Sequence, residues 1–390
     1  MADALKTFFS PSLVSRLAAD LSRAHSSFPV RAFVRDACEG LETLELLDRG
    51  RHISRALGRH LPPAYPDALD VLLKSLGPEH PTDELVGAGM APFFYLPHLL
   101  FVADRGLDHF DLSMRAQYEL TKRFSAESSI RPYITRDPER VMAVLRAWTK
   151  DPNAHVRRLV SEGTRLRLPW AQRVDWLDRH PERVLALLEP LKDDPTTLVR
   201  RSVANNLNDL GKVHPDLLIR TASAWLADAS MDRRRLVEHA LRSIVKRGNK
   251  QALGLLGYGT KPSVKVESVV FVPRRVRIGG HVVMSFALRS TSRVSQDLLV
   301  DAAVHFVKAR GVTSAKVFKV RRLALGARER QAMTVTFSVA VHTTRVPRPG
   351  SHAVDLVLNG HAVRAGSFDV IAPARGRRST RKPRIPPRAR

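Results

Sequence analysis

The segments DPNAHVRRLV (residues 151–160) and DPTTLVRRSV (residues 194–203) are two copies of one pattern, displaced by 43 residues. In each copy an Asp-Pro pair precedes apolar residues at helical spacing and two adjacent arginines. Aspartate is a good helix cap and proline suits the first helical position, so the pair predicts the start of a helix. A degenerate third copy, RRRLVEHALR, begins at Arg233.

A repeat of 43 residues falls within the range of HEAT and armadillo repeats. Stacked helix pairs of this length form a curved solenoid with a concave face. Apolar residues recur at helical spacing over most of the chain before residue 260, for example at Leu13, Leu17 and Leu21. An ordinary helical bundle is the alternative interpretation.

The pattern changes near residue 260, where short alternating runs begin. TVTFSVAV (residues 334–341) is the clearest of these, and its inward face is predicted to consist of Val335, Phe337, Val339 and Val341. Gly279-Gly280 and Asn359-Gly360 look like hairpin turns between such runs. About seven candidate strands lie between Val264 and Ile371, which suits a small β-sandwich.

The predicted protein is therefore multidomain, with an all-α solenoid followed by a β-sandwich. We place the helical domain at residues 1–258 and the sandwich at residues 264–371, joined by the linker GYGTKPS near residues 257–263. Residues 372–390 form a basic tail that is rich in proline and arginine. Because it has no apolar run able to fold, we predict that this tail is disordered.

The composition points to a polyanionic partner. The formal net charge is +26 and the sequence pI is about 11.2. Eight lysines or arginines lie between Pro373 and Arg390, and +18 remains without them. Nucleic acid is the first interpretation of such a charge, and an anionic membrane is the second.

The single cysteine, Cys38, excludes a disulfide framework and a cysteine-rich zinc site, and fits a reducing compartment. The N-terminus does not read as a signal peptide. The most apolar stretch, APFFYLPHLLFVAD, is too short to span a bilayer. We expect a cytoplasmic protein that is not bound to a membrane.

Polar residues gather on one face of each repeat. At about 100° per residue, Arg158, Glu162 and Arg165 fall together opposite the apolar stripe of the first copy. In the second copy the residues that fall together are Arg201, Asn205 and Asn208, with Asp209 beside them. Such faces suit a phosphate backbone. The alternative is that they are ordinary i,i+3 and i,i+4 ion pairs on a solvated surface.

Three segments carry a family resemblance: LTKRFSAESSIRPYI (residues 120–134), RRLVSEGTRLRLPWA (157–171) and VRRSVANNLNDLGKVHPD (199–216). They resemble the AlkC family of DNA glycosylases, and the resemblance extends over nearly all of residues 1–256. One subgroup of that family has an additional C-terminal immunoglobulin-like domain, which the β-rich half resembles. The resemblance implies HEAT-like repeats that wrap duplex DNA.

The resemblance also implies removal of bases such as 3-methyladenine and 3-methylcytosine, without the extrusion of the nucleotide that is usual for glycosylases. The matching acidic residues are Glu127, Glu162 and Asp209, and the matching aromatic is Trp170. Family members are expected to have an aromatic or apolar residue where this chain has Ser128-Ser129.

These residue types suit the chemistry. A base alkylated at N3 is cationic and leaves readily, so the transition state concentrates positive charge on the deoxyribose. A nearby carboxylate and a positioned water would then help, with Glu162 and Asp209 as the main candidates and Glu127 in support. Trp170 would stack on the sugar or hold the cationic base, its alternative role being that of an aromatic in the core or at the edge of the solenoid.

The remaining predictions concern partners. Phosphate contacts are predicted for Arg157, Arg158, Arg165, Arg200, Arg201, Arg274 and Arg275. The histidines have no metal-ligand spacing, so we expect neither a metal nor a cofactor. No lysine stands out as a nucleophile, which predicts a monofunctional enzyme, and we expect a monomer. The competing hypotheses are a non-catalytic scaffold for damaged or bent DNA and a protein-binding HEAT scaffold.

Overall fold

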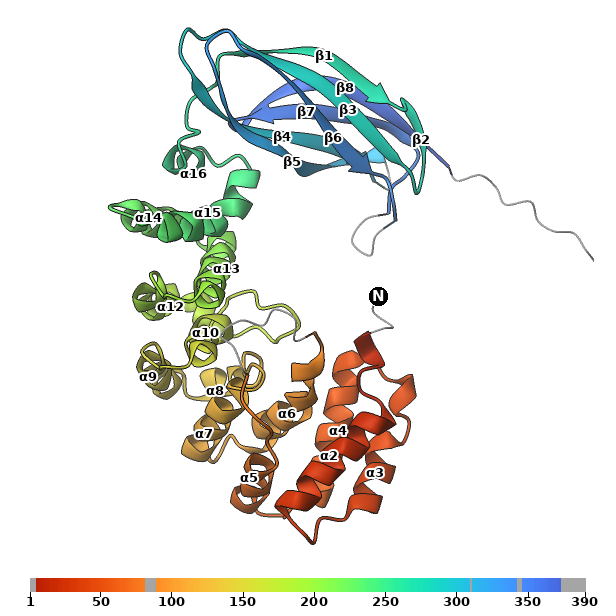
Figure 1. Ribbon diagram of the computed structural model, residues 1–390, viewed down its shortest axis with the longest axis vertical. Coiled ribbons are helices and arrows are strands. Elements are labelled where there is room, and N and C mark those ends of the chain that lie inside the picture. Colours follow the sequence, from red (N-terminus) through yellow and green to blue (C-terminus); the bar gives the residue numbers. More distant parts are fainter. Residues whose placement is uncertain (1–4, 81–88, 309–310, 342–345, 373–390) are drawn as a thin grey trace, which may run out of the picture. The chain divides into compact units, whose positions relative to one another are not determined.

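The computed structural model describes residues 5–80, 89–308, 311–341 and 346–372. The predicted disordered tail lies outside these described residues. The chain divides into two compact units, Met1–Ser243 and Ile244–Arg390. The first unit is helical, and strands dominate the second (Figure 1).

The first helices of the helical unit pack side by side, and the later helices form pairs that stack on one another (Figure 1). Its helices are α2 (Pro11–Ala24), α3 (Val30–Cys38), α4 (Leu46–His60), α5 (Tyr65–Lys74), α6 (Leu96–Arg105), α7 (Phe110–Thr121), α8 (Arg131–Arg136), α9 (Pro138–Trp148), α10 (Ala154–Gly163), α11 (Asp175–Arg179), α12 (Pro181–Leu188), α13 (Thr197–Val213), α14 (Pro215–Leu226) and α15 (Met231–Lys246). Short 3-10 turns lie at Leu41–Thr43, Ala91–Tyr95 and Glu189–Leu191. Within the described residues, no helix has both the length and the apolar character needed to cross a bilayer.

The repeats stack as predicted. Helices α9, α12 and α14 form one row, and α10, α13 and α15 form the other (Figure 1). The predicted apolar stripe of α10, formed by Val156, Leu159 and Val160, is completely buried. The buried Asn206 ties α13 to α10, because its Nδ2 donates to the Ser161 carbonyl at 2.7 Å. The solenoid of helical repeats is therefore confirmed.

The starts of the repeat helices differ from the prediction. The N-cap of α10 is Asn153, whose side chain accepts from two backbone N–H groups of the first turn, and not Asp151. Asp151 Oδ1 instead accepts from the Asn153 N–H at 2.8 Å, and Asp194 Oδ1 accepts from the Thr196 N–H at 2.9 Å. Each aspartate thus shapes the turn that precedes its helix, as short acidic side chains often do. The expectation that the Asp-Pro pairs cap and open these helices was wrong.

The first arginine of each repeat closes the same turn. Arg157 Nη1 donates to the carbonyls of Asp151 and Pro152, and Arg200 Nη1 donates to those of Asp194 and Pro195. Each arginine also reaches the next repeat. Arg157 Nε lies 2.6 Å from Asp194 Oδ2, and Arg200 Nη2 lies 3.0 Å from an Asp232 carboxylate oxygen. We call these paired contacts the Asp–Arg ladder.

The second unit contains helix α16 (Lys250–Leu255) and eight described strands: β1 (Val264–Val272), β2 (Arg275–Arg277), β3 (His281–Ser290), β4 (Gln296–Val307), β5 (Thr313–Leu325), β6 (Arg330–Ser338), β7 (Gly350–Leu358) and β8 (His361–Ile371). They form a three-stranded sheet in the order β1-β3-β6 and a five-stranded sheet in the order β2-β8-β7-β4-β5. Both sheets contribute to one apolar core that includes Phe286, Val304 and Phe337. The predicted β-sandwich is therefore confirmed.

The turns explain the sheet register. Asn359 and Gly360 join β7 to β8, and their φ angles of 48° and 79° are those of the tight hairpin turn that the Asn-Gly pair predicts. Gly279 and Gly280 lie between β2 and β3, but these strands belong to different sheets, so the predicted hairpin turn at this pair was wrong. The inward face of β6 is shorter than predicted, because the strand ends at Ser338 and Val341 is exposed.

The predicted linker at residues 257–263 has no helix or strand, and it packs on the β unit. The Asn359 side chain donates to the Thr260 carbonyl at 3.4 Å, and the Arg322 guanidinium lies over the Tyr258 ring. These contacts hold the linker to the strands that follow it.

Candidate active site

The structure brings the three predicted carboxylates onto one face of the repeats. Glu127 lies in the loop between α7 and α8, Glu162 in the last turn of α10 and Asp209 on α13. A cation follows each of them, and the charges alternate. We call this set the charge row, and in order it consists of Glu127, Arg158, Glu162, Arg165, Asp209 and Lys212.

Short contacts hold the inner part of the charge row together. Arg165 Nη1 lies 2.6 Å from Glu162 Oε1, and its Nε lies 2.8 Å from Asp209 Oδ2. Lys212 Nζ contacts the other Asp209 oxygen at 2.7 Å. Three carboxylates face three cations, so the row has no formal net charge.

The outer part of the charge row is held more loosely. Arg158 Nη2 lies 3.1 Å from Glu127 Oε2 and 3.8 Å from Glu162 Oε2. Ser125 also donates to Glu127 Oε2 at 2.8 Å. Arg158 Nη1 also donates to the Ser125 hydroxyl at 3.0 Å.

Burial distinguishes the carboxylates. The side chain of Asp209 is 1% exposed and that of Glu162 is 7% exposed, whereas that of Glu127 is 30% exposed. The ion pairs of the alternative interpretation are present at i,i+3 and i,i+4 spacing, but the surface is not solvated there, because both acids are buried and the Arg165 side chain is only 12% exposed. Helical spacing alone did not predict this burial, which arises from the packing of α13 against α10.

Glu162 is held in its ionised form. Burial raises the pKa of this carboxyl, but the charges of Arg158 and Arg165 and the hydrogen bond from Ser202 lower it further, so the net pKa lies below its ordinary value. Ser202 Oγ donates to Glu162 Oε2 at 2.5 Å. Glu162 is consequently an anion at neutral pH.

The buried Arg131 on α8 anchors the loop that follows α10. Its guanidinium donates to the carbonyls of Gly163, Arg165 and Gln172 at 2.9, 3.0 and 2.7 Å. Burial lowers the pKa of Arg131 to about 10, so it stays charged at neutral pH. Sequence reasoning missed this residue, although it lies within the quoted segment at residues 120–134.

Trp170 lies in this anchored loop and is 70% exposed. Its φ of 62° is in the left-handed region, which a bulky residue adopts only under constraint from its surroundings. This exposure excludes the alternative role as a core aromatic and leaves that of an aromatic at the edge of the solenoid open. The indole is available to a ligand.

Ser128 and Ser129 stand where an aromatic or apolar residue is expected. Ser129 is buried, and its hydroxyl donates to Gln117 Oε1 at 2.6 Å. Gln117 in turn donates to the Ser129 carbonyl at 3.0 Å. Hydrogen bonds to α7 thus fix the loop that presents Glu127.

The predicted phosphate contacts fall into three groups. Arg157 and Arg200 belong to the Asp–Arg ladder, and Arg158 and Arg165 belong to the charge row. Arg201, on α13, and Arg274 and Arg275, at the start of β2, are exposed. Contact with DNA stays a prediction for all seven residues.

Other residues of the helical face were missed by sequence reasoning. A pocket of about 270 Å³ between α13 and α15 is lined in part by Arg201, Arg235 and His239. Arg242 of α15 donates to Asn205 at 2.9 Å. Lys212 had a usable signal, because it follows Asp209 at i+3 spacing.

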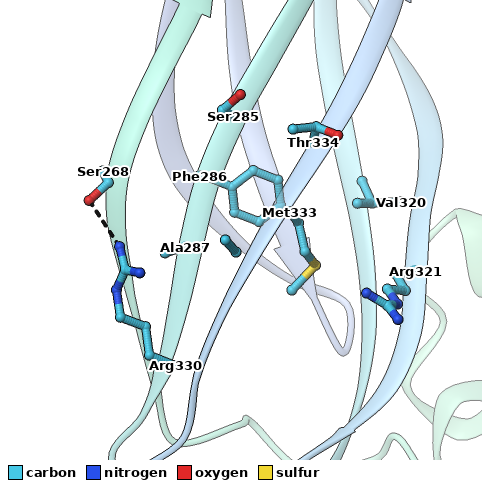
Figure 2. Close-up of a pocket in the computed structure, with 10 residues that line it drawn as sticks. Ser268, Ser285, Phe286, Ala287, Val320, Arg321, Arg330, Met333 and Thr334 are labelled. Carbon is cyan, nitrogen blue, oxygen red and sulfur yellow. Dashed lines mark hydrogen bonds between the residues drawn. The ribbon is translucent and has the colours of Figure 1, made fainter.

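The β unit has a pocket of its own, between β3 and β6 on one side and β5 on the other (Figure 2). It encloses about 570 Å³, with Phe286 and Met333 among its apolar lining and Arg321 and Arg330 among its charged lining. Arg330 also contacts the Ser268 hydroxyl at 3.4 Å (Figure 2). None of the predicted site residues lines this pocket.

A metal centre has no visible basis in the described part of the chain. Among those residues, no group of three or more His, Cys, Asp or Glu side chains is placed to hold an ion. Cys38 is half-buried and free.

Comparison with known proteins gives the family to which this helical-repeat chain with a β-sandwich belongs. Residues 124–246 match the family model for "DNA alkylation repair enzyme". Residues 265–372 match the model for the C-terminal Ig-like domain of the uncharacterised protein YhaZ. Together the two matches span the site and the β-sandwich.

Two individual proteins are similar over nearly the whole chain. The uncharacterised protein YhaZ of Bacillus subtilis (strain 168) is 34% identical over 375 residues, which are 95% of this chain and 100% of YhaZ. The solved structure of Pseudomonas fluorescens alkylpurine DNA glycosylase AlkC, bound to DNA with an abasic site analog, is also 34% identical. It matches with a TM-score of 0.87 and covers 94% of this chain and 99% of that one. The chain belongs to the AlkC family of DNA alkylation repair enzymes and has the family's C-terminal Ig-like domain.

Proposed function

We propose that this chain is a monofunctional DNA glycosylase that hydrolyses the N-glycosidic bond of cationic alkylated bases in duplex DNA. The substrates are 3-methyladenine and 3-methylcytosine, and the reaction proceeds without extrusion of the nucleotide. The observation that carries the proposal is the convergence of Glu127, Glu162 and Asp209 in the charge row. The similarity to AlkC supports it.

The carboxylates fit the needs of this reaction. A cationic base leaves as a neutral molecule, so no strong general acid is required, and positive charge develops on the sugar. A carboxylate held in its ionised form stabilises that charge electrostatically. Glu162 and Asp209 serve this purpose and position the attacking water, with Glu127 in support.

Trp170 supplies the contact to the lesion. Its exposed indole stacks on the sugar or on the cationic base by a cation–π interaction. The constrained backbone at Trp170 holds the ring in place before DNA arrives, which limits the ordering cost of binding.

Exposed arginines supply the contacts to the DNA phosphates. Arg201 contacts a phosphate from the helical unit, and Arg274 and Arg275 contact phosphates from the β unit. Arg157 and Arg200 act mainly between repeats, through the Asp–Arg ladder. We further propose that the protein acts as a monomer in the bacterial cytosol, where it associates with the nucleoid through DNA.

Chromatography of bases released from methylated duplex DNA tests the function. We expect free 3-methyladenine and 3-methylcytosine, with abasic strands that stay uncleaved until alkali is added. Uracil and hypoxanthine in matched duplexes stay attached, because neither base is cationic before the enzyme acts. Tight binding without release of any methylated base would support the alternative of a non-catalytic scaffold, and efficient release of uracil would contradict the electrostatic mechanism.

A further inference from the structure

The place of Arg165 differs from that of a phosphate contact. It follows the last turn of α10, and its side chain is only 12% exposed. Two of its nitrogens are engaged by Glu162 and Asp209, which belong to different repeats. Its own carbonyl accepts from the buried Arg131. Both the side chain and the backbone are thus fixed.

We propose that Arg165 is a positioning residue, which places one positive charge between the Glu162 and Asp209 carboxylates and sets the distance between them. This inference rests on the proposed glycosylase function. It removes Arg165 from the set of phosphate contacts that its sequence position suggested. Arg165 does not itself act on the sugar; it acts by holding the two carboxylates that do.

The argument depends on the cost of two buried anions. The Glu162 and Asp209 carboxylates contact one guanidinium, so they lie close together, and both are shielded from water. Two neighbouring carboxylates without a counter-ion do not both ionise, and one of them retains a proton at neutral pH. A protonated member of the pair would no longer stabilise positive charge on the sugar.

Other charged groups surround the pair, and none of them replaces Arg165. Arg158 lies 3.8 Å from Glu162, and Lys212 reaches only Asp209. Arg242 of α15 interacts electrostatically with Asp209 and Arg165, and Arg131 of α8 does so with Arg165. Glu127 adds a further negative charge to the face. Arg165 is the group among these that contacts both acids at hydrogen-bond distance.

The test uses the full-length chain with Arg165→Gln and the conservative Arg165→Lys. Single-turnover release of 3-methyladenine is measured at saturating protein between pH 5 and pH 9. Affinity for unmodified duplex DNA and its dependence on salt are measured in parallel. Arg201→Gln is the matched comparison, since it removes one positive charge from an exposed side chain on the neighbouring helix. Thermal unfolding shows which variants are folded.

For Arg165→Gln we expect the rate of base release at pH 7 to fall by at least about tenfold. The rate should rise toward high pH, and the acid side of the pH–rate profile should move to higher pH. Its affinity for unmodified DNA should change less than twofold, with an unaltered salt slope. Arg165→Lys should recover part of the rate, and it alone decides the matter if the glutamine variant does not fold.

Two results would overturn the inference. One is weaker binding to unmodified DNA with a reduced salt slope and an unchanged pH profile, because this pattern indicates a lost phosphate contact. The other is a pH-independent loss of rate in both variants, which indicates a general distortion of the site. Failure of the unaltered protein to release any methylated base would instead refute the proposed function.

Discussion

At the scale of single residues, the deepest carboxylates are expected to dominate the reaction. Glu162→Gln and Asp209→Asn preserve the shape of each side chain but remove its charge, so both should stay folded and lose rate. We expect each to lower single-turnover base release by about 100-fold, as is usual when one preorganised electrostatic group is removed. Glu182→Gln on α12 is a suitable control, because Glu182 is exposed and outside the charge row. An unchanged rate in either variant would remove that residue from the mechanism.

A second residue links stability to pH. His98 on α6 is buried beside Phe94 and Tyr95, and neither ring nitrogen has a hydrogen-bond partner among the described residues. Burial lowers the pKa of His98 to about 4 from its ordinary value of 6.5. Stability that depends on neutral His98 is therefore complete above pH 6.5 and falls as the pH decreases toward 4, because the unfolded chain takes up the proton first.

Urea unfolding at pH 7 and pH 5 measures this effect. The unaltered protein should lose about 2 kcal/mol more of its unfolding free energy over this interval than His98→Phe, which cannot be protonated. Parallel loss in the two proteins would show that His98 does not contribute to acid sensitivity.

At the scale of helices and turns, the Asp–Arg ladder should govern stability more than DNA affinity. Asp194 is buried and accepts hydrogen bonds from Arg157 Nε and Nη2 at 2.6 and 3.1 Å. Asp194→Asn removes the negative charge that faces the Arg157 guanidinium, and we expect a loss of about 3 kcal/mol in unfolding free energy. The affinity for duplex DNA, measured well below the melting temperature, should stay within twofold. A large loss of affinity with full stability would return Arg157 to the predicted phosphate contacts.

The same scale shows what a single sequence reveals. The 43-residue repeat, the buried stripe of α10 and the Asn-Gly hairpin follow from local patterns, so they were predictable. The Asp-Pro helix start was wrong because the carboxylate bonds the turn and Asn153 caps the helix. Local propensity indicates that a helix starts near these residues, but it does not decide whether Asp151 or Asn153 is the N-cap.

The site was predictable in part. The family resemblance identified the three acids, but their burial and pairing depend on contacts between repeats. Arg165 shares a helical face with Glu162 in the sequence, whereas its bond to Asp209 arises only when α13 packs on α10. Arg131 stabilises a loop more than thirty residues away, a contact that no local pattern encodes.

At the scale of the whole molecule, the β unit is expected to take part in DNA binding. Arg274 and Arg275 are exposed at β2, an edge strand of the five-stranded sheet. Replacing both with glutamine in the full-length chain should weaken binding to any duplex and reduce the slope of log K against log salt by about 2. Replacement of the exposed Arg23 and Arg35 on α2 and α3 removes the same charge as a control. If binding is unchanged but the protein aggregates, these arginines protect a sheet edge instead.

The exposed indole of Trp170 has an optical consequence. The chain has four tryptophans, and the other three are half-buried or buried. Trp170 should therefore contribute the most red-shifted part of the intrinsic fluorescence and the part most accessible to acrylamide. When a base or sugar stacks on the ring, that emission should decrease, and Trp170→Phe should abolish the change. The protein thus has a built-in reporter, with which stopped-flow mixing separates the arrival of the lesion from the cleavage of the glycosidic bond.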